Sequence, residues 1–512
     1  MAKIKLKNNI FADFSGGYAS EQAYMPEERA SFIGDSKNID IFPTSHNDGY
    51  GFRKTKGNTV FAELSGQKIK GLYSYNYQKD ADYLLIYTVN DTDGRLYYMD
   101  STGTINLLKD GLTKTAVNGG FVNFSQTLPN KRYLGIFGNG VDKFIKIELS
   151  GNPQIEEIDA KDNQNRNVRS YILETYYGRV WCGVDDRIHW SKSLDPFTWS
   201  TQTDDAGWQQ LDSDIVAITS YADGLVISTK KSMYYCRKGS SGFTFTTISP
   251  NHAVSSRAMV KHDNYALYMA DDGIYPINAT QEDTKKVDED VSWLLNKYLQ
   301  NRDRYNYDNM FALSVTSKER NEVWFHVPMN GMANKSCIFI YRFLTGRQKH
   351  LYWLPPRIEQ KINCLIDFDN MILSGTDDGK ILTELSGKTF NGETIESIAE
   401  FPELDFNGTY NKQKFKLFLY SELEENNKFY VDYFFNGERD FDRQEVILAN
   451  TNFKWGECKW GEFTWATSAM LEYQLDKPRK HNKLKLRFVA NEAGQDFVIN
   501  SIVTTRVKVK NK

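Results

Sequence analysis

The sequence predicts an all-β protein, and three observations support that prediction. Aromatic residues make up 14% of the chain, with 30 Tyr and 31 Phe, and these residue types favour strands. Short runs of apolar residues, several of them alternating with polar ones, recur along most of the sequence. Asp-Gly pairs separate several of these runs and supply the positive φ that tight hairpin turns require.

The first 62 residues are expected to form an extended N-terminal arm. Residues 1–62 are rich in Asn, Gly, Ser and isolated aromatic residues, and they alternate only weakly. About 50 extended residues span roughly 165 Å at about 3.3 Å each, which is long enough to contact a neighbouring subunit. A disordered or self-packed tail explains the same composition, so that alternative stays open.

Residues 63–386 repeat one unit: an apolar strand, a turn of Gly, Asp or Asn, and a strand with aromatic residues. The repeats recur at roughly 35 to 50 residues, which is the period of β-propeller blades. Radially arranged four-stranded sheets bury both faces, which a lone hairpin cannot do. We expect a six- or seven-bladed β-propeller, with a pair of β-sandwiches as the alternative. The repeated segments are residues 83–108, 132–149, 170–191, 214–238, 258–277, 311–354 and 363–385.

One helix is expected as an insertion between blades, at about residues 288–306. Five apolar or aromatic residues share one face at helical spacing, after an acidic first turn. Such an insertion either caps the propeller or meets a partner, and Trp293 and Tyr298 are the side chains we assign to a partner interface. The residues on the shared face are Val291, Leu294, Leu295, Tyr298 and Leu299.

Residues 387–512 are expected to form a separate antiparallel β-sandwich, similar to a jelly roll. Their strand-like segments alternate strictly between apolar and polar residues, as in a half-exposed sheet. The run FKWGECKWGEFTW repeats Lys-Trp-Gly-Glu and holds Trp455, Trp460 and Trp465. Such residues pack in cores, contact other subunits or stack on sugar rings, so we assign all three to a partner interface.

Charge, apolar runs and cysteines limit the class of protein. The net charge is -3, whereas proteins that wrap nucleic acid usually carry a basic excess. No run approaches the roughly 18 apolar residues of a membrane span, which predicts a soluble protein made in the cytoplasm. The five cysteines are far apart in the sequence, so we expect reduced, mostly buried thiols.

The stretch SLDPFTW resembles the Asp-box turn of sialidase-like propellers. Ser193, Asp195, Thr198 and Trp199 occur in the order of that motif, but Phe197 occupies its Gly position and the Trp comes one residue early. We expect a hairpin in which Asp195 and Thr198 bond to turn amides and Trp199 packs between blades. A degenerate glycoside hydrolase is the enzymatic alternative.

Other catalytic and ligand-binding patterns are weak. The seven histidines form no pair at metal-ligand spacing, and no phosphate-binding Gly-rich loop or G-x-S-x-G turn occurs. Residues Asp91 to Gly94 resemble part of a Ca²⁺ loop but lack its downstream Glu, and a turn explains them equally well. We therefore assign no catalytic, cofactor-binding or metal-binding residue, and expect a protein that is not an enzyme.

The order of these segments resembles a known family. The arm contains GYGFRKTKG, the repeats include RVWCGVDDRIHWSKSLDPFTW, GLVISTKKSMYYCRK and NYALYMADDGIYPI, and the chain closes with the sandwich. This layout resembles the tail-nozzle, or packaged-DNA stabilisation, proteins of short-tailed bacteriophages. The resemblance covers nearly the whole chain, and it rests on turn and apolar patterns with no catalytic motif.

The resemblance implies a structural protein of the virion tail. Copies of the chain, as a homohexamer, would form a ring that retains packaged double-stranded DNA and conducts its ejection. The implied partners are the adaptor and portal side of the tail, a tail fibre or tail tip, and DNA passing without sequence-specific binding. A carbohydrate- or receptor-binding tail protein and a tail-hub or adaptor-adjacent protein are the alternatives.

Overall fold

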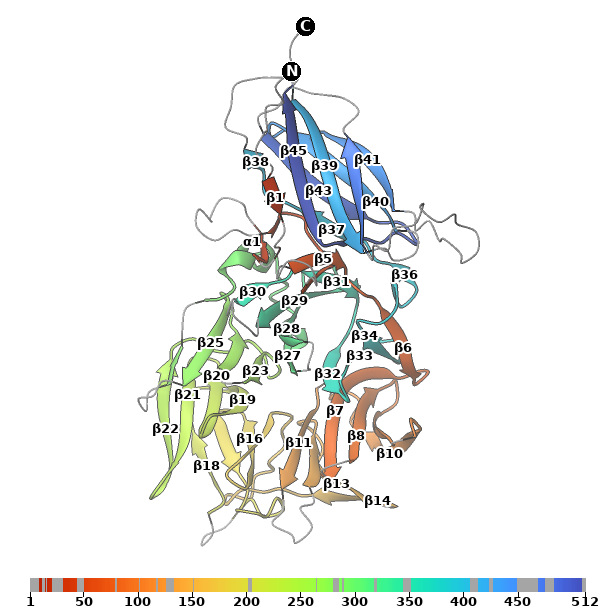
Figure 1. Cartoon of the computed structure of the whole chain (residues 1–512). Coiled ribbons are helices and arrows are strands. Elements are labelled where there is room, and N and C mark those ends of the chain that lie inside the picture. Colours follow the sequence, from red (N-terminus) through yellow and green to blue (C-terminus); the bar gives the residue numbers. More distant parts are fainter. Residues whose placement is uncertain are drawn as a thin grey trace. The chain divides into compact units, whose positions relative to one another are not determined.

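In the structure, a computed structural model, nearly all of the regular elements are β-strands (Figure 1), which confirms the all-β prediction. The chain divides into unit 1, residues 1–57, 338–359 and 385–512, and unit 2, residues 58–337 and 360–384. The structure describes residues 9–11, 14, 16–20, 31–43, 50–78, 81–100, 102–116, 118–125, 133–150, 152–200, 205–263, 265–279, 285–287, 290–316, 320–343, 351–405, 413–422, 427–448, 468–474 and 483–508.

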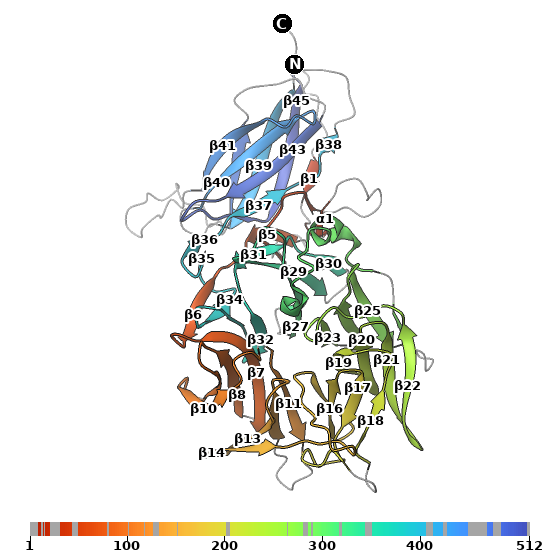
Figure 2. The same cartoon turned by 180° about the vertical axis from the view of Figure 1, so that it is seen from behind.

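Unit 2 contains strands of seven successive antiparallel sheets in a propeller-like arrangement (Figures 1 and 2), and only the strands that lie in unit 2 follow. Their strands are β7 (Lys68–Gln78), β8 (Ala81–Val89), β9 (Gly94–Met99), β10 (Ile105–Leu112); β11 (Gly120–Ser125), β12 (Tyr133–Gly138), β13 (Phe144–Ser150), β14 (Asn152–Ile158); β15 (Leu173–Tyr176), β16 (Arg179–Val184), β17 (Arg187–Trp190), β18 (Gly207–Gln210); β19 (Ile215–Tyr221), β20 (Gly224–Thr229), β21 (Met233–Gly239), β22 (Gly242–Ser249); β23 (Met259–His262), β24 (Tyr265–Met269), β25 (Ile274–Ala279), β26 (Lys285–Val287); β27 (Phe311–Thr316), β28 (Asn321–Val327); β32 (Cys364–Phe368), β33 (Met371–Gly375) and β34 (Lys380–Glu384).

The first strands of these sheets form a closed circle of contacts. Each contacts the first strand of the next sheet, in the order β7, β11, β15, β19, β23, β27 and β32, and β32 contacts β7 again. The last sheet also takes β6 (Asn58–Glu63), which pairs antiparallel with β34 so that Thr59 lies opposite Thr383. A strand that the prediction placed in the arm, apart from Glu63, thus pairs with the final strand of the repeated region.

Apolar side chains fill the spaces between neighbouring sheets. Phe124 of the second sheet, Val180 and Cys182 of the third, and Trp199 belong to one buried cluster. Strands packed on both faces lose the alternation of a half-exposed strand, and all six residues of β20 are buried. This packing explains why several repeated segments are continuously apolar in sequence.

Unit 1 contains two larger sheets, with strand orders β1-β45-β39-β42 and β37-β43-β40-β41, and smaller sheets that include β4-β5-β44. Strand β29 (Lys335–Phe343) crosses from unit 2 into unit 1. The unit 1 strands are β1 (Asn9–Phe11), β2 (Tyr18–Ala19), β3 (Phe32–Ile33), β4 (Ile39–Pro43), β5 (Tyr50–Lys54), β30 (Leu351–Trp353), β31 (Arg357–Gln360, whose last residue is in unit 2), β35 (Thr389–Phe390), β36 (Glu393–Thr394), β37 (Ser397–Glu400), β38 (Leu404–Asp405), β39 (Gln413–Glu422), β40 (Asn427–Phe435), β41 (Phe441–Leu448), β42 (Ser468–Gln474), β43 (Lys483–Ala490), β44 (Val498–Ile499) and β45 (Ser501–Lys508).

The described part of the predicted N-terminal arm packs on its own chain. Phe14, Phe32 and Phe52 are buried, and the Phe14 and Phe52 ring centroids lie 4.8 Å apart. Phe52 also meets Phe401 and Phe488 from the C-terminal part of unit 1, at 5.4 and 5.7 Å. These contacts correspond to the self-packed alternative, and contact with a neighbouring subunit stays a prediction.

The helix predicted at about residues 288–306 is wrong in its length. Over the described residues 290–309 the helical elements are a 3-10 turn η2 (Trp293–Leu295), one α-turn α1 (Asn296–Leu299) and a later 3-10 turn η3 (Tyr307–Asn309). Asp290, expected to serve the first helical turn, instead accepts hydrogen bonds from the amides of Ile274 and Ser292, at 3.1 and 2.7 Å. The acid therefore fastens the insertion to the β24–β25 turn.

Candidate partner interface

Acidic side chains fix the turns between the second and third strands of the sheets. Asp142 accepts hydrogen bonds from the amide and hydroxyl of Thr113, at 2.8 and 2.7 Å. Partial burial raises the pKa of Asp142, but hydrogen bonds from Thr113 and Asn139 outweigh burial and hold that pKa below its ordinary value. Asp377 in the last sheet accepts from Lys70 and Asn363, both at 2.9 Å. These bonds fasten each turn to a preceding or adjoining segment.

Side-chain hydrogen bonds also join neighbouring first strands of the circle. Glu174 of β15 accepts from the Ser220 amide of β19 at 3.0 Å. His262 of β23 and Ser314 of β27 are bonded at 2.8 Å. Burial raises the pKa of Glu174, because ionisation in the interior is costly. Two further links run from Asn123 to the Ser74 carbonyl, at 3.0 Å, and from the Thr316 amide to Asp367, at 3.4 Å.

The buried histidine and cysteine side chains serve packing. His326 lies between the Asn309 carbonyl at 2.7 Å and the Ser336 hydroxyl at 2.8 Å, and burial lowers its pKa to about 4. Burial raises the pKa of the Cys337 thiol to about 12, which keeps it protonated and unreactive at neutral pH.

The prediction of reduced, buried cysteines is confirmed for Cys182, Cys236, Cys337 and Cys364. Cys458 lies outside the described residues.

The stretch SLDPFTW forms a turn held by its own side chains. Asp195 accepts from the Phe197 amide at 2.9 Å and from the Thr198 hydroxyl at 2.7 Å. Trp199 is 3% exposed, and its ring lies 5.5 Å from that of Phe144 in the second sheet. The prediction that Asp195 bonds a turn amide and Trp199 packs between sheets is confirmed, whereas the Thr198 hydroxyl bonds Asp195 and not an amide.

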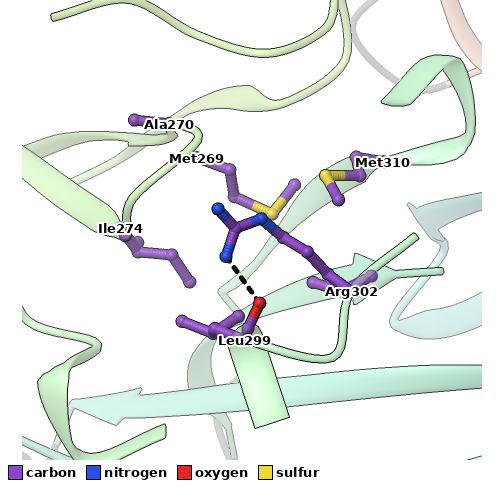
Figure 3. Close-up of a pocket in the computed structure, with 8 residues that line it drawn as sticks. Met269, Ala270, Ile274, Leu299, Arg302 and Met310 are labelled. Carbon is purple, nitrogen blue, oxygen red and sulfur yellow. Dashed lines mark hydrogen bonds between the residues drawn. The ribbon is translucent and has the colours of Figure 1, made fainter. Parts of the chain in front are cut away.

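The insertion that precedes β27 is fastened to the β24–β25 turn through Asp271. Arg302 donates to the Asp271 carboxylate at 3.2 Å and to the Leu299 carbonyl at 2.5 Å, and the Tyr307 hydroxyl also donates to Asp271. Figure 3 shows the Arg302 guanidinium beside Met269 and directed at the Leu299 carbonyl. This arrangement buries the arginine while a half-exposed carboxylate holds it.

The cavity beside Arg302 is too small for a metabolite. Its volume is about 10 Å³, which is room for one water molecule. Ligand pockets usually measure about 300 to 1,000 Å³. We therefore interpret the cavity as a packing gap under the insertion.

The predicted interface residues differ in their exposure, and their role at an interface stays a prediction. Trp293 is 41% exposed on the insertion, while Tyr298 is partly buried there. The structure adds Tyr305, which is fully exposed and lies just before η3. No periodic pattern marks Tyr305, since it stands in the polar run NRDRYNYDN. Trp455, Trp460 and Trp465 lie outside the described residues.

Comparison with protein-family models found no match, and comparison with curated proteins found none either. Among the residues that the structure places, His, Cys, Asp and Glu side chains form no group of three suited to a metal ion. Over the same part of the chain, the helices are too short or too polar to cross a membrane.

Proposed function

We propose that this chain is a structural subunit of a virus particle, of the kind that forms the tail nozzle of short-tailed bacteriophages. Copies of the chain, as a hexamer, form a ring at the end of the tail channel, retain packaged DNA and conduct it during ejection. The subunit meets the adaptor and portal side of the tail and the tail fibre or tail tip. Its place is in the virion.

Unit 2 is, in this proposal, a seven-bladed β-propeller. The closed circle of first strands and the pairing of β6 with β34 both support that architecture. Pairing of the last sheet with a strand that precedes the first sheet leaves few open sheet edges, which favours a stable subunit. Unit 1 then carries a β-sandwich built from its two larger sheets.

The exposed aromatic side chains of the insertion are the observation that carries the proposal. Trp293 and Tyr305 lie on the insertion, which Asp271 and Asp290 fasten to the β24–β25 turn of the same unit. Large aromatic groups held on a fixed segment lose little conformational entropy on association, and they dominate the energetics of subunit interfaces. Such a surface suits a subunit that builds permanent contacts.

Particle assembly tests the proposal. Particles produced with the variant Trp293→Ser, Tyr305→Ser should contain at least about tenfold fewer copies of the chain, because interface aromatic residues often contribute 2 kcal/mol or more. Leu107→Ser is the matched control, since Leu107 is 52% exposed on β10 and should be dispensable.

A particle reconstruction locates the wild-type chain. Density for a ring of copies at the tail end is the expected result. Particles that lack this chain at the tail contradict the proposal. So does incorporation of the Trp293→Ser, Tyr305→Ser variant at the level of the Leu107→Ser control.

A further inference from the structure

Three exposed apolar side chains lie on two neighbouring turns of the third sheet. Tyr177 is 58% exposed, Leu194 49% and Phe197 37%. Tyr177 lies in the β15–β16 turn, and the other two lie in the turn that follows β17. We call these three residues the turn patch.

Two members of the turn patch have a backbone conformation that large side chains rarely adopt. The φ angles are 51° at Tyr177 and 59° at Leu194, in the left-handed region. Of the 12 non-glycine residues with positive φ among those described, Asn or Asp occupies eight, which are Asn38, Asn165, Asp185, Asp263, Asp369, Asn370, Asn391 and Asn436. The four exceptions are Tyr177, Leu194, Ala222 and Leu385, so two of the four belong to the turn patch.

The equivalent turn in the last sheet has Asp and Asn, the residue types that favour positive φ. Asp369 and Asn370 join β32 to β33, the first two strands of that sheet, with φ of 48° and 58°. Tyr177 and Gly178 join the first two strands of the third sheet with φ of 51° and 66°. The geometry therefore accepts Asn or Asp, and tyrosine at this place is not required by the fold.

The two turns hold each other in position. The Leu194 amide donates to the Gly178 carbonyl at 2.7 Å, and a Cβ added to Gly178 would lie 3.2 Å from the Leu194 Cδ2. Asp195 and Thr198 fix the second turn from within. The exposed side chains are consequently presented on a rigid frame, which lowers the entropy that binding would cost.

One lysine side chain lies beside Phe197 and another beside Tyr177. The Lys146 ammonium is 5.2 Å from the centroid of the Phe197 ring and also pairs with Glu156 at 3.2 Å. The Lys238 ammonium is 6.0 Å from the Tyr177 ring. Among the residues that the structure places, Lys238 has no carboxylate partner. The same ammonium lies 5.0 Å from the Phe243 ring, and it can pair with a carboxylate of a partner beside Tyr177.

We propose that the turn patch binds an acidic peptide segment of another protein. Apolar side chains of that segment cover Tyr177 and Leu194, and a flanking carboxylate pairs with Lys238. Apolar burial supplies affinity, and the charge pair supplies orientation. This inference does not depend on the proposed function, because any partner with this chemistry satisfies it.

Selection from a library of random twelve-residue peptides tests the proposal on the full-length chain. Peptides selected by the wild type should carry Asp or Glu beside apolar residues. The variant Tyr177→Asn, Leu194→Asn should weaken binding of a selected peptide about tenfold or more, by fluorescence anisotropy. Lys238→Gln should weaken it severalfold and flatten its salt dependence. Leu107→Asn, which removes an apolar side chain that is similarly exposed on β10, is the control and should bind normally.

The double Asn variant also separates binding from folding. Because Asn tolerates positive φ better than Tyr or Leu, its melting temperature should be unchanged or higher. A clear fall in melting temperature would show that the two side chains serve the fold, and would overturn the proposal. So would selected peptides without acidic residues, or equal selection by wild type and variant. Self-association of the wild type that the variant loses would make the occupant a second copy and would equally overturn it.

Discussion

At the scale of single residues, the SLDPFTW turn shows how a motif shared with enzymes serves structure. Asp195 and Thr198 satisfy each other and the turn backbone, and Trp199 fills the space between the second and third sheets. The residues that make a turn stable are Asp, Ser, Thr and Pro, and they recur wherever such a turn is needed. These residues in a sequence therefore indicate a stable turn, and by themselves they do not indicate an active site.

Replacing Trp199 by alanine should destabilise unit 2 by about 3 to 5 kcal/mol, because it leaves a large cavity between two sheets. Urea unfolding followed by circular dichroism measures the change. Trp293→Ala is the control, since that side chain is 41% exposed and its loss should cost about 0.5 kcal/mol or less. A loss below about 1 kcal/mol for Trp199→Ala would contradict the packing role.

Stability should fall as the pH drops below 6.5. The folded pKa of His326 is about 4, so the unfolded chain takes up a proton below its ordinary pKa of 6.5 while the folded chain does not. The stability is complete above pH 6.5 and declines toward pH 4, by about 2 kcal/mol at pH 5 for this one histidine.

Thermal unfolding across pH 5 to 7.5 measures that decline. His189, whose pKa burial also lowers to about 4, contributes in the same direction. His326→Gln should make the decline shallower. An identical pH profile for that variant would show that His326 is not responsible.

At the scale of elements, one strand, β6, joins the segment before the seven sheets to the last of them. β6 and β34 are separated by most of the chain, and Asn58 of β6 approaches Glu384, 326 residues away in sequence. Ser374 donates to the same buried Glu384 at 2.6 Å. This polar contact at the end of β6 favours the observed register, because a shift would remove the hydrogen bond from Asn58 to a buried carboxylate.

Proline substitutions in β6 should weaken the pairing of β6 with β34. Thr59→Pro and Val60→Pro remove neighbouring amides, and in an antiparallel pair one of two neighbours donates to the partner strand. At least one variant should therefore lose about 3 kcal/mol and unfold at a lower temperature. Val60→Ala is the control, since this side chain is 50% exposed. Unchanged melting of both proline variants would contradict the closing role of β6.

At the scale of the whole molecule, neither unit is one continuous stretch of sequence. Unit 1 takes residues 1–57, 338–359 and 385–512, and residues 338–359 interrupt unit 2. Strand β44 near the C-terminus pairs with β5, and Phe497 meets Phe52 at 5.8 Å. The C-terminal part consequently needs the N-terminal part to complete its core.

Residues 385–512 expressed alone should fail to fold cooperatively. Without Phe52 the aromatic cluster around Phe401 and Phe488 loses its centre, and β44 loses its partner. Heat denaturation followed by near-ultraviolet circular dichroism should show no sharp transition. Residues 58–384 are the comparison, since they keep all seven sheets together with β6. A sharp transition in the C-terminal fragment would show that this part is an independent domain.

The sequence by itself determined the features that depend on neighbouring residues. Alternation and Asp-Gly turns predicted the all-β class and the repeated sheets, and the SLDPFTW composition predicted a turn locked by Asp195. Only the tertiary structure decided the rest. The pairing of β6 with β34, the place of Phe52 in unit 1 and the short helix of the insertion all depend on contacts with distant residues. Local patterns cannot encode these contacts, because the same acid or aromatic residue suits a helix cap, a turn or a core until its spatial neighbours are known.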